Sequence, residues 1–261
     1  MPVYKLLIEY YGKNFFGSQI QRINRSTSVD KGSLTRKDQF RTVQGVLESV
    51  LNKLLTSKFK LQLVSRTDTG VHALCNVCKL VCEEVIDDRD EFLKKINYFL
   101  PEDLQVVDIV KVRKSFNVFN ARQKVYYYLL YNSSYSTPTI FKDYCWHLTQ
   151  EISFKKLQQV LKIISSQKKF DFVTTKQYVE ERKNTRCKIA ITVTKFQRFI
   201  IFKFVGNKFT HRMIRNIVSL AVEIATGKLG FDEIKRIISE WKYCKLKPAP
   251  AKGLMLAKII I

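Results

Sequence analysis

Apolar and polar residues alternate along this chain with two different periods, and the changes of period predict its elements. Apolar residues spaced three or four apart indicate helices, and short runs rich in β-branched or aromatic residues indicate strands. In the first part of the chain the pattern predicts a strand at 3–10, a helix from Thr42 to about 54, strands at about 59–66 and 74–82, a helix at about 89–99 and a strand at 104–112.

The second part repeats this order of elements. The pattern predicts strands at 124–131 and through Tyr144 and Trp146, a helix beginning at Ser153, strands at 187–196 and 199–206, helices at 210–226 and 231–241, and a strand at 254–261. Two stretches without a period, 21–41 and 171–184, are predicted to be polar loops, the first of them long and basic.

The order β-α-β-β-α-β therefore occurs twice, which is typical of ferredoxin-like units. The predicted fold class is α+β, with an N-terminal half at 1–114 and a C-terminal half at 115–261. We expect two antiparallel sheets joined into one long sheet around a central basic cleft. Two RNA-recognition modules are the alternative, but no strand carries their characteristic aromatic motif.

The net positive charge of the chain indicates which class of molecule it binds. The chain has 46 Lys and Arg against 23 Asp and Glu, a formal charge of +23. An excess of this size, spread along the chain, favours a polyanionic partner, most often nucleic acid. A membrane surface is the alternative, but neither a polybasic amphipathic helix nor a membrane-spanning apolar run is evident.

Six cysteines are present, and no secretory signal is recognisable. We therefore expect free thiols and an intracellular location, whether mitochondrial, cytoplasmic or nuclear. Cys75 and Cys78 lack the second pair that a zinc site needs, and the three histidines lack metal-ligand spacing. The sequence thus predicts no metal site.

One polar turn stands out as a candidate for chemistry. The stretch from Arg66 to His72 (RTDTGVH) lies between two apolar runs and contains a single carboxylate, Asp68. A carboxylate beside an arginine is a plausible catalytic group. The same residues can equally form a structural hairpin turn, because Gly70 can adopt positive φ and Asp68 can bond its own backbone.

This stretch resembles the signature of the TruA family of tRNA pseudouridine synthases, Arg-Thr-Asp-x-Gly-Val-His, and the resemblance continues in order along the chain. The other matching motifs are Tyr10-x-Gly12 with Phe16-Gly17-x-Gln19, Thr42-Val43-Gln44 with Leu47-Glu48, Tyr126-x-Tyr128 with Tyr131-Asn132, Phe209-x-His211-x-Met213-Ile214-Arg215-Asn216-Ile217-Val218, and Pro250-Ala251-x-Gly253-Leu254. Six ordered motifs are far more specific than any one of them.

The resemblance implies a function and a set of site residues. The family converts uridine to pseudouridine in tRNA, commonly in the anticodon arm, on a flipped base and without a cofactor. By this resemblance Asp68 is the catalytic aspartate, and Arg215 pairs with it. Tyr126 stacks on the target uracil, Arg66 helps to displace the nucleotide, and Leu254 forms an apolar wall under the base. The partner implied is tRNA or another structured RNA, and the family suggests a homodimer.

Several alternatives stay open at this point. Asp68 can attack as a nucleophile or act in proton transfer, and Arg215 alone could be a solvated phosphate-binding residue. A catalytically silent protein, or one that binds mRNA or mitochondrial RNA, could use the same scaffold. Ser65, where the family often has Gly, and the residues that follow Ala73 resemble a divergent animal branch. Ser18, where the family often has Trp, is a further departure that leaves the choice of RNA open.

Overall fold

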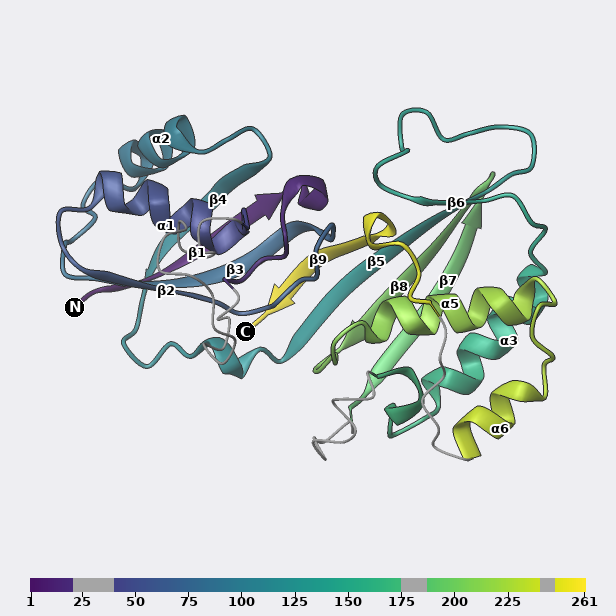
Figure 1. Cartoon of the computed structure of the whole chain (residues 1–261). Coiled ribbons are helices and arrows are strands. Elements are labelled where there is room, and N and C mark those ends of the chain that lie inside the picture. Colours follow the sequence, from purple (N-terminus) through teal and green to yellow (C-terminus); the bar gives the residue numbers. More distant parts are fainter. Residues whose placement is uncertain (21–39, 175–186, 240–246) are drawn as a thin grey trace, which may run out of the picture. The chain divides into compact units, whose positions relative to one another are not determined.

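The computed structural model describes residues 1–20, 40–174, 187–239 and 247–261 (Figure 1). It divides into two compact units: Met1–Ala121 together with Ile261, and Arg122–Ile260. Residues 21–39 of the predicted basic loop, 175–184 of the second predicted loop and 240–241 of the last predicted helix lie outside the described residues.

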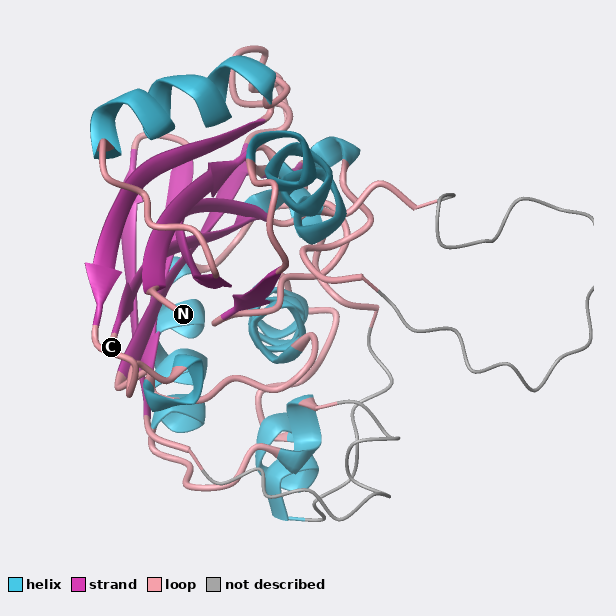
Figure 2. Ribbon diagram, turned by 90° about the vertical axis from the view of Figure 1, so that its left-hand side faces the viewer, coloured by secondary structure: helices cyan, strands magenta, loops and turns pink. Residues whose placement is uncertain are grey.

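Unit 1 has the order β-α-β-β-α-β. Its elements are β1 (Val3–Tyr10), α1 (Val43–Leu54), β2 (Phe59–Leu63), β3 (His72–Cys82), α2 (Arg89–Phe99) and β4 (Leu104–Val112). The strands lie side by side in the order β4-β1-β3-β2, and every neighbouring pair is antiparallel. Helix α1 contacts β2 and α2 contacts β4, so the helices lie against the sheet of their own unit (Figures 1 and 2).

A side-chain cap fixes the start of α1. The Thr42 side chain accepts a hydrogen bond from the N–H of Gly45, which satisfies one of the free donors at the start of α1. Val43, Leu47 and Leu51 then recur at helical spacing and are buried. The predicted helix beginning after Thr42 is therefore confirmed.

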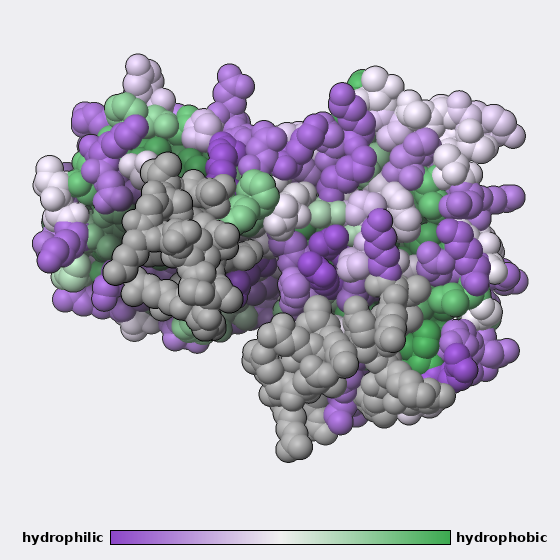
Figure 3. All heavy atoms as spheres, viewed as in Figure 1, coloured by the Kyte–Doolittle hydropathy of each residue, from purple (hydrophilic) through white to green (hydrophobic). Residues whose placement is uncertain are grey.

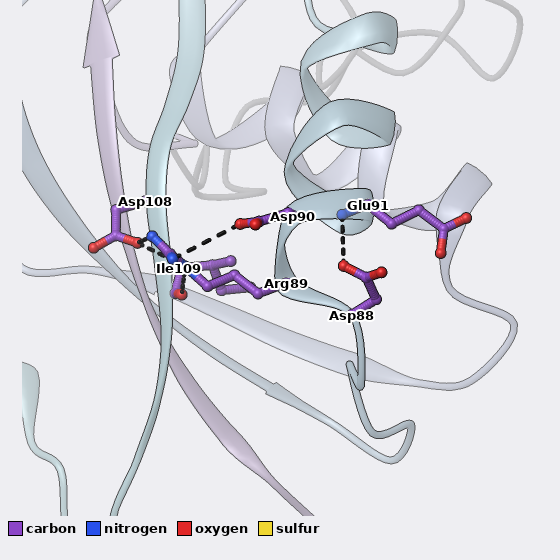
Figure 4. Close-up of polar contacts among 6 residues, drawn as sticks. All are labelled: Asp88, Arg89, Asp90, Glu91, Asp108 and Ile109. Atoms are coloured by element: carbon purple, nitrogen blue, oxygen red, sulfur yellow. Dashed lines mark hydrogen bonds and ion pairs between the residues drawn. The ribbon is translucent and has the colours of Figure 1, made fainter.

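Helix α2 is attached to β4 by Arg89, its first residue (Figure 4). The Arg89 guanidinium donates from Nη2 to Asp108 Oδ1 at 2.6 Å and from Nε to the carbonyl of Ile109 at 3.1 Å. Asp88 caps the helix by accepting from the N–H of Glu91 at 2.8 Å. The hydrogen bond and charge of Asp108 raise the pKa of Arg89.

Unit 2 repeats the same arrangement. Its elements are β5 (Gln123–Asn132), β6 (Trp146–Leu148), α3 (Phe154–Ser165), β7 (Ile189–Phe196), β8 (Phe199–Gly206), α5 (Met213–Ala225), α6 (Glu233–Ser239) and β9 (Leu254–Ile260). The order is β9-β5-β8-β7 with antiparallel pairs, so the first strand lies between the fourth and the third as in unit 1. The predicted α+β class and the repeated β-α-β-β-α-β order are confirmed.

Two details of the prediction for unit 2 are wrong. The stretch predicted as a polar loop from Asp171 begins with a short 3-10 helix, Asp171–Val173, in which Phe172 and Val173 are buried. Its core position follows from α5, where Asn216 Nδ2 donates to the carbonyl of Val173 at 2.8 Å. The short strand β6 excludes Tyr144 and runs parallel to β5.

Hydrophilic side chains cover much of the surface seen in Figure 3. Among the described residues, no helix combines the length and the apolar composition needed to cross a bilayer.

Candidate active site

Asp68 lies in the loop between β2 and β3 of unit 1. Its carbonyl accepts from the N–H of Val71 at 3.2 Å, which closes a β-turn, and Gly70 has φ of +78°. The turn interpretation is therefore correct for the backbone. The Asp68 side chain is half-buried, while Arg66 in the same loop is exposed. The turn thus presents a carboxylate and an arginine at one short loop.

Ser18 ties this loop to the segment that follows β1. The N–H of Ser18 donates to the carbonyl of Thr67 at 3.1 Å, and its Oγ accepts from the N–H of Thr67 at 2.8 Å. The backbone comes close here because Gly17, with φ of +87°, has no side chain: a Cβ would lie 3.1 Å from the Thr67 carbonyl. Ser18 is fully buried. The departure from the family pattern at this position therefore has a structural role.

A buried polar network holds the other side of the loop. The Tyr10 hydroxyl is 2.9 Å from Thr67 Oγ1, and Asn76 Nδ2 donates to that hydroxyl at 3.1 Å. Asn76 Nδ2 also donates to the carbonyl of Ser65 at 2.8 Å. Ser65 and Thr67, the residues on both sides of Arg66, are consequently held by these hydrogen bonds, which restricts where the neighbouring Asp68 carboxylate can point.

His72 closes the loop against the turn after β1. The N–H of Gly12 donates to His72 Nδ1 at 3.0 Å, so this nitrogen carries no proton and the ring is neutral. The ring is 2% exposed and stacks on Tyr11 with a centroid distance of 5.1 Å. This arrangement orients the loop and leaves His72 a poor proton donor at Nδ1.

Replacing Ser18 with alanine should lower the stability of unit 1. The substitution leaves the Thr67 N–H buried without its acceptor, at an expected cost of about 1–3 kcal/mol in the free energy of unfolding, measured by urea titration. The exposed Ser115 is the control, since Ser115→Ala should change stability by less than about 0.5 kcal/mol. Equal stability of the two variants would show that the Ser18 hydroxyl does not hold the loop.

Tyr126 lies in unit 2 on β5, where alternate side chains point to opposite faces of the sheet. Tyr126 and Tyr128 share the buried face, and Tyr127 lies on the other face and is half-buried. Tyr126 is 6% exposed, and its ring meets Phe209 edge to face at 5.1 Å between centroids. The predicted stacking tyrosine is thus packed against a second aromatic residue.

Arg215 lies in the first turn of α5 and is half-buried. Its Nε donates to the carbonyl of Ala249 at 2.7 Å, and the N–H of Ala249 donates to the carbonyl of Arg215 at 3.2 Å. The Tyr128 hydroxyl donates to the next carbonyl, Pro250, at 3.0 Å. Burial raises the pKa of Tyr128 well above its usual value, although the positive charge of Arg215 opposes this.

Leu254 begins β9 directly opposite Tyr128 and is 7% exposed. The residue before it, Gly253, touches the Tyr128 ring: a Cβ there would lie 2.6 Å from Tyr128 Cζ. In unit 2, Arg215 and Leu254 both lie close to Tyr128, and Tyr126 is on the same face of β5 two residues away. Asp68 and Arg66 belong to unit 1.

Sequence reasoning assigned no role in the site to Ser18, Asn76 or Phe209. Ser18 and Asn76 are short polar residues whose partners are distant in sequence, so no local spacing could reveal them. Phe209 stood inside a matching motif, three residues beyond the end of β8, but its contact with Tyr126 depends on the fold of the chain.

No group of three or more His, Cys, Asp or Glu residues within the described ranges could hold a metal ion. Burial raises the pKa of the Cys78 thiol far above its usual value and that of Cys145 to about 11, which keeps both thiols protonated.

Comparison with known proteins agrees with these features. The profile of a family described as tRNA pseudouridine synthase matches residues 167–260. The tRNA pseudouridine synthase A of Phytoplasma mali is 32% identical over 259 residues, which covers 98% of this chain and 97% of that protein. Proteins of the same name from Pseudothermotoga lettingae and Aquifex aeolicus are 30% and 28% identical, with 98% and 100% of both chains covered.

The chain has two ferredoxin-like units, a turn at Asp68 and a strand bearing Tyr126, as the resemblance to the pseudouridine synthase class predicts. The similarity extends along essentially the whole chain. The chain belongs to the TruA family of tRNA pseudouridine synthases. These relatives do not bear on the resemblance to a divergent animal branch, which stays a prediction.

Proposed function

We propose that this protein is a tRNA pseudouridine synthase that acts on a flipped uridine. The observation that carries the proposal is the similarity over 98% of the chain to proteins named tRNA pseudouridine synthase A. The catalytically silent alternative has no observation in its favour.

The reaction is an isomerisation, so it adds and removes no atoms overall. The bond from the sugar C1′ to uracil N1 breaks, the base turns, and a bond from C1′ to C5 forms. The C5 hydrogen leaves as a proton, and N1 gains one from solvent. A single carboxylate beside the sugar can support these steps by attack or by proton transfer, and we assign this role to Asp68. The buried bonds to Thr67 and Ser65 support the assignment, because they fix the turn before the substrate arrives.

Tyr126 supplies an aromatic ring for the target uracil in this proposal. Stacking on an aromatic side chain contributes about 1–3 kcal/mol per base, which offsets much of the cost of removing a base from its stack. Only 6% of Tyr126 is exposed, so stacking requires that neighbouring side chains uncover the ring when RNA binds. Phe209, at 5.1 Å, is one neighbour that would move.

Arg215 is assigned to the anionic partner that the family resemblance implies, the carboxylate of Asp68. Its bond from Nε to the Ala249 carbonyl orients the guanidinium. Leu254, which lies opposite Tyr128, is assigned to the apolar wall that contacts the base. The exposed Arg66 is assigned to the displaced nucleotide.

The charge of +23 fits a tRNA substrate. Each phosphate contact releases counterions, so affinity for tRNA should fall steeply as salt rises.

The proposal is tested with unmodified tRNA transcripts that carry tritium at C5 of uridine. The purified protein should release tritium to solvent without any added cofactor, and chemical mapping should then place pseudouridine in the anticodon arm. Tight, salt-sensitive tRNA binding with no tritium release across a panel of transcripts would favour the silent alternative. Pseudouridine in mRNA or mitochondrial RNA, but not in tRNA, would correct the substrate.

We also propose a homodimer, on the family resemblance alone. Sedimentation equilibrium should give a mass of about twice 30.6 kDa, and a single 30.6 kDa species at micromolar concentration would refute it.

A further inference from the structure

Lys124, the second residue of β5, lies on the same face of its strand as Tyr126, because the two are separated by one residue. It is opposite Gly206 of β8 on one side and Ile259 of β9 on the other. The side chain is half-buried. No hydrogen bond or ion pair joins it to any residue that the structure describes.

Lys124 has the same surroundings as Tyr126, the tyrosine that is proposed to stack on the base. Gly206, the residue of β8 opposite Lys124, has no side chain. The Phe209 ring occupies the space that a side chain would fill, because a Cβ on Gly206 would lie 3.0 Å from Phe209 Cζ. The same Phe209 ring contacts Tyr126. Two strand residues rise roughly 6–7 Å, so Lys124 and Tyr126 are near neighbours along β5.

An ammonium group at such a position is incompletely solvated and lacks a counter-charge among the residues that the structure describes. Burial lowers the pKa of Lys124, which shows that the protein alone disfavours the charged form. A bound anion removes this penalty, since an opposite charge within a few ångströms stabilises the ammonium. The substrate of the proposed reaction carries one phosphate per nucleotide, so a phosphate anion lies near when a base reaches Tyr126.

We propose that Lys124 binds a backbone phosphate beside the target uridine and so positions the nucleotide whose base stacks on Tyr126. Lys124 is a positioning residue: it acts on the RNA backbone and takes no part in bond breaking. The inference rests on the proposed function, because it assumes that an RNA base reaches Tyr126.

The test compares three variants on one tRNA transcript. Lys124→Met removes the charge and keeps much of the length, and Lys124→Arg keeps the charge. Lys203→Met is the matched control, because Lys203 is an exposed lysine on β8 opposite Tyr127, on the other face of the same sheet. Dissociation constants are measured between low and moderate salt, and kcat and KM are measured separately.

Lys124→Met should raise KM and the dissociation constant about five- to tenfold, leave kcat within about twofold, and reduce the salt slope by about 0.7–0.9, the value for one phosphate contact. Lys124→Arg should restore all three to within about twofold of wild type. Lys203→Met should change none of them by more than about twofold.

Identical salt slopes and KM values for Lys124→Met and Lys203→Met would overturn the inference. An unchanged KM with a large fall in kcat would also overturn it, since Lys124 would then act in the chemistry. Thermal unfolding of each variant excludes misfolding, and Lys124→Gln replaces Lys124→Met if the latter unfolds. One result would separate the two proposals. If the wild-type protein forms no pseudouridine, but Lys124→Met still reduces the salt slope of tRNA binding, the proposed function is refuted and the phosphate contact of Lys124 stands.

Discussion

Replacing Asp68 with asparagine is expected to abolish pseudouridine formation while tRNA binding and folding stay close to wild type. Asparagine has nearly the same shape but can neither attack a sugar or base carbon nor accept a proton at neutral pH. The backbone bonds of the turn use the Asp68 carbonyl and its neighbours, so they survive the change. The loss should therefore appear in kcat and not in the dissociation constant.

The size of the loss also reports on mechanism. Proton transfer by a positioned side chain contributes about 10²–10⁴-fold, so a fall within that range favours acid–base chemistry. Removal of a covalent nucleophile should cost more than this, as it does in enzymes whose catalytic groups act as a unit. Single-turnover tritium release measures the residual rate, and the exposed Asp87 provides the control variant Asp87→Asn, which should retain full activity. Half of the wild-type rate in Asp68→Asn would show that another group carries the reaction.

Replacing Gly12 with alanine is expected to destabilise unit 1 by roughly 3 kcal/mol or more, since it forces overpacking against backbone. An added Cβ would lie 2.0 Å from the carbonyl oxygen of Val71 and 2.4 Å from its carbonyl carbon. Separating the segments would strain the bond from the Gly12 N–H to His72 Nδ1, which anchors the loop of Asp68. Activity should fall together with stability.

Urea unfolding followed by far-ultraviolet circular dichroism measures this effect. Gly230→Ala is the control, because no atom lies within 4 Å of a Cβ at that position. It should change the free energy of unfolding by less than about 0.5 kcal/mol. A Gly12→Ala protein as stable as Gly230→Ala would mean that the approach of Gly12 to Val71 is not maintained in solution.

The elements of this fold could be predicted from the sequence where one strong local signal decided them. Thr42 and Ser153 each precede an amphipathic run, and each caps its helix as such residues do. The failure at Phe172 and Val173 has a physical cause. Both residues lie in a polar stretch too short to show a period, and their burial depends on α5, which comes some 40 residues later.

The site was predictable only through the ordered motifs. The signature at Asp68 fits a structural turn as well as a catalytic one, and the geometry shows a turn whichever role the carboxylate has. The burial of Tyr126 and its contact with Phe209 could not be derived, because they depend on how β5 pairs with β8. The positive φ of Arg212, +59° directly before α5, could not be predicted either, because this conformation favours glycine and nothing in the sequence marks it.

The pairing of β9 with β5 also governs when unit 2 can fold during synthesis. A nascent chain emerges from its N-terminal side, so β1 to β4 are all available to one another before translation of β5 begins. β5 pairs with β9, from Gln123 opposite Ile260 to Tyr128 opposite Leu254, and β9 is made last. Until then a tyrosine-rich strand keeps one open edge, which is a site for pairing with other chains. Unit 1 can thus begin to fold while unit 2 is still being synthesised, whereas the sheet of unit 2 stays incomplete until β9 has left the ribosome.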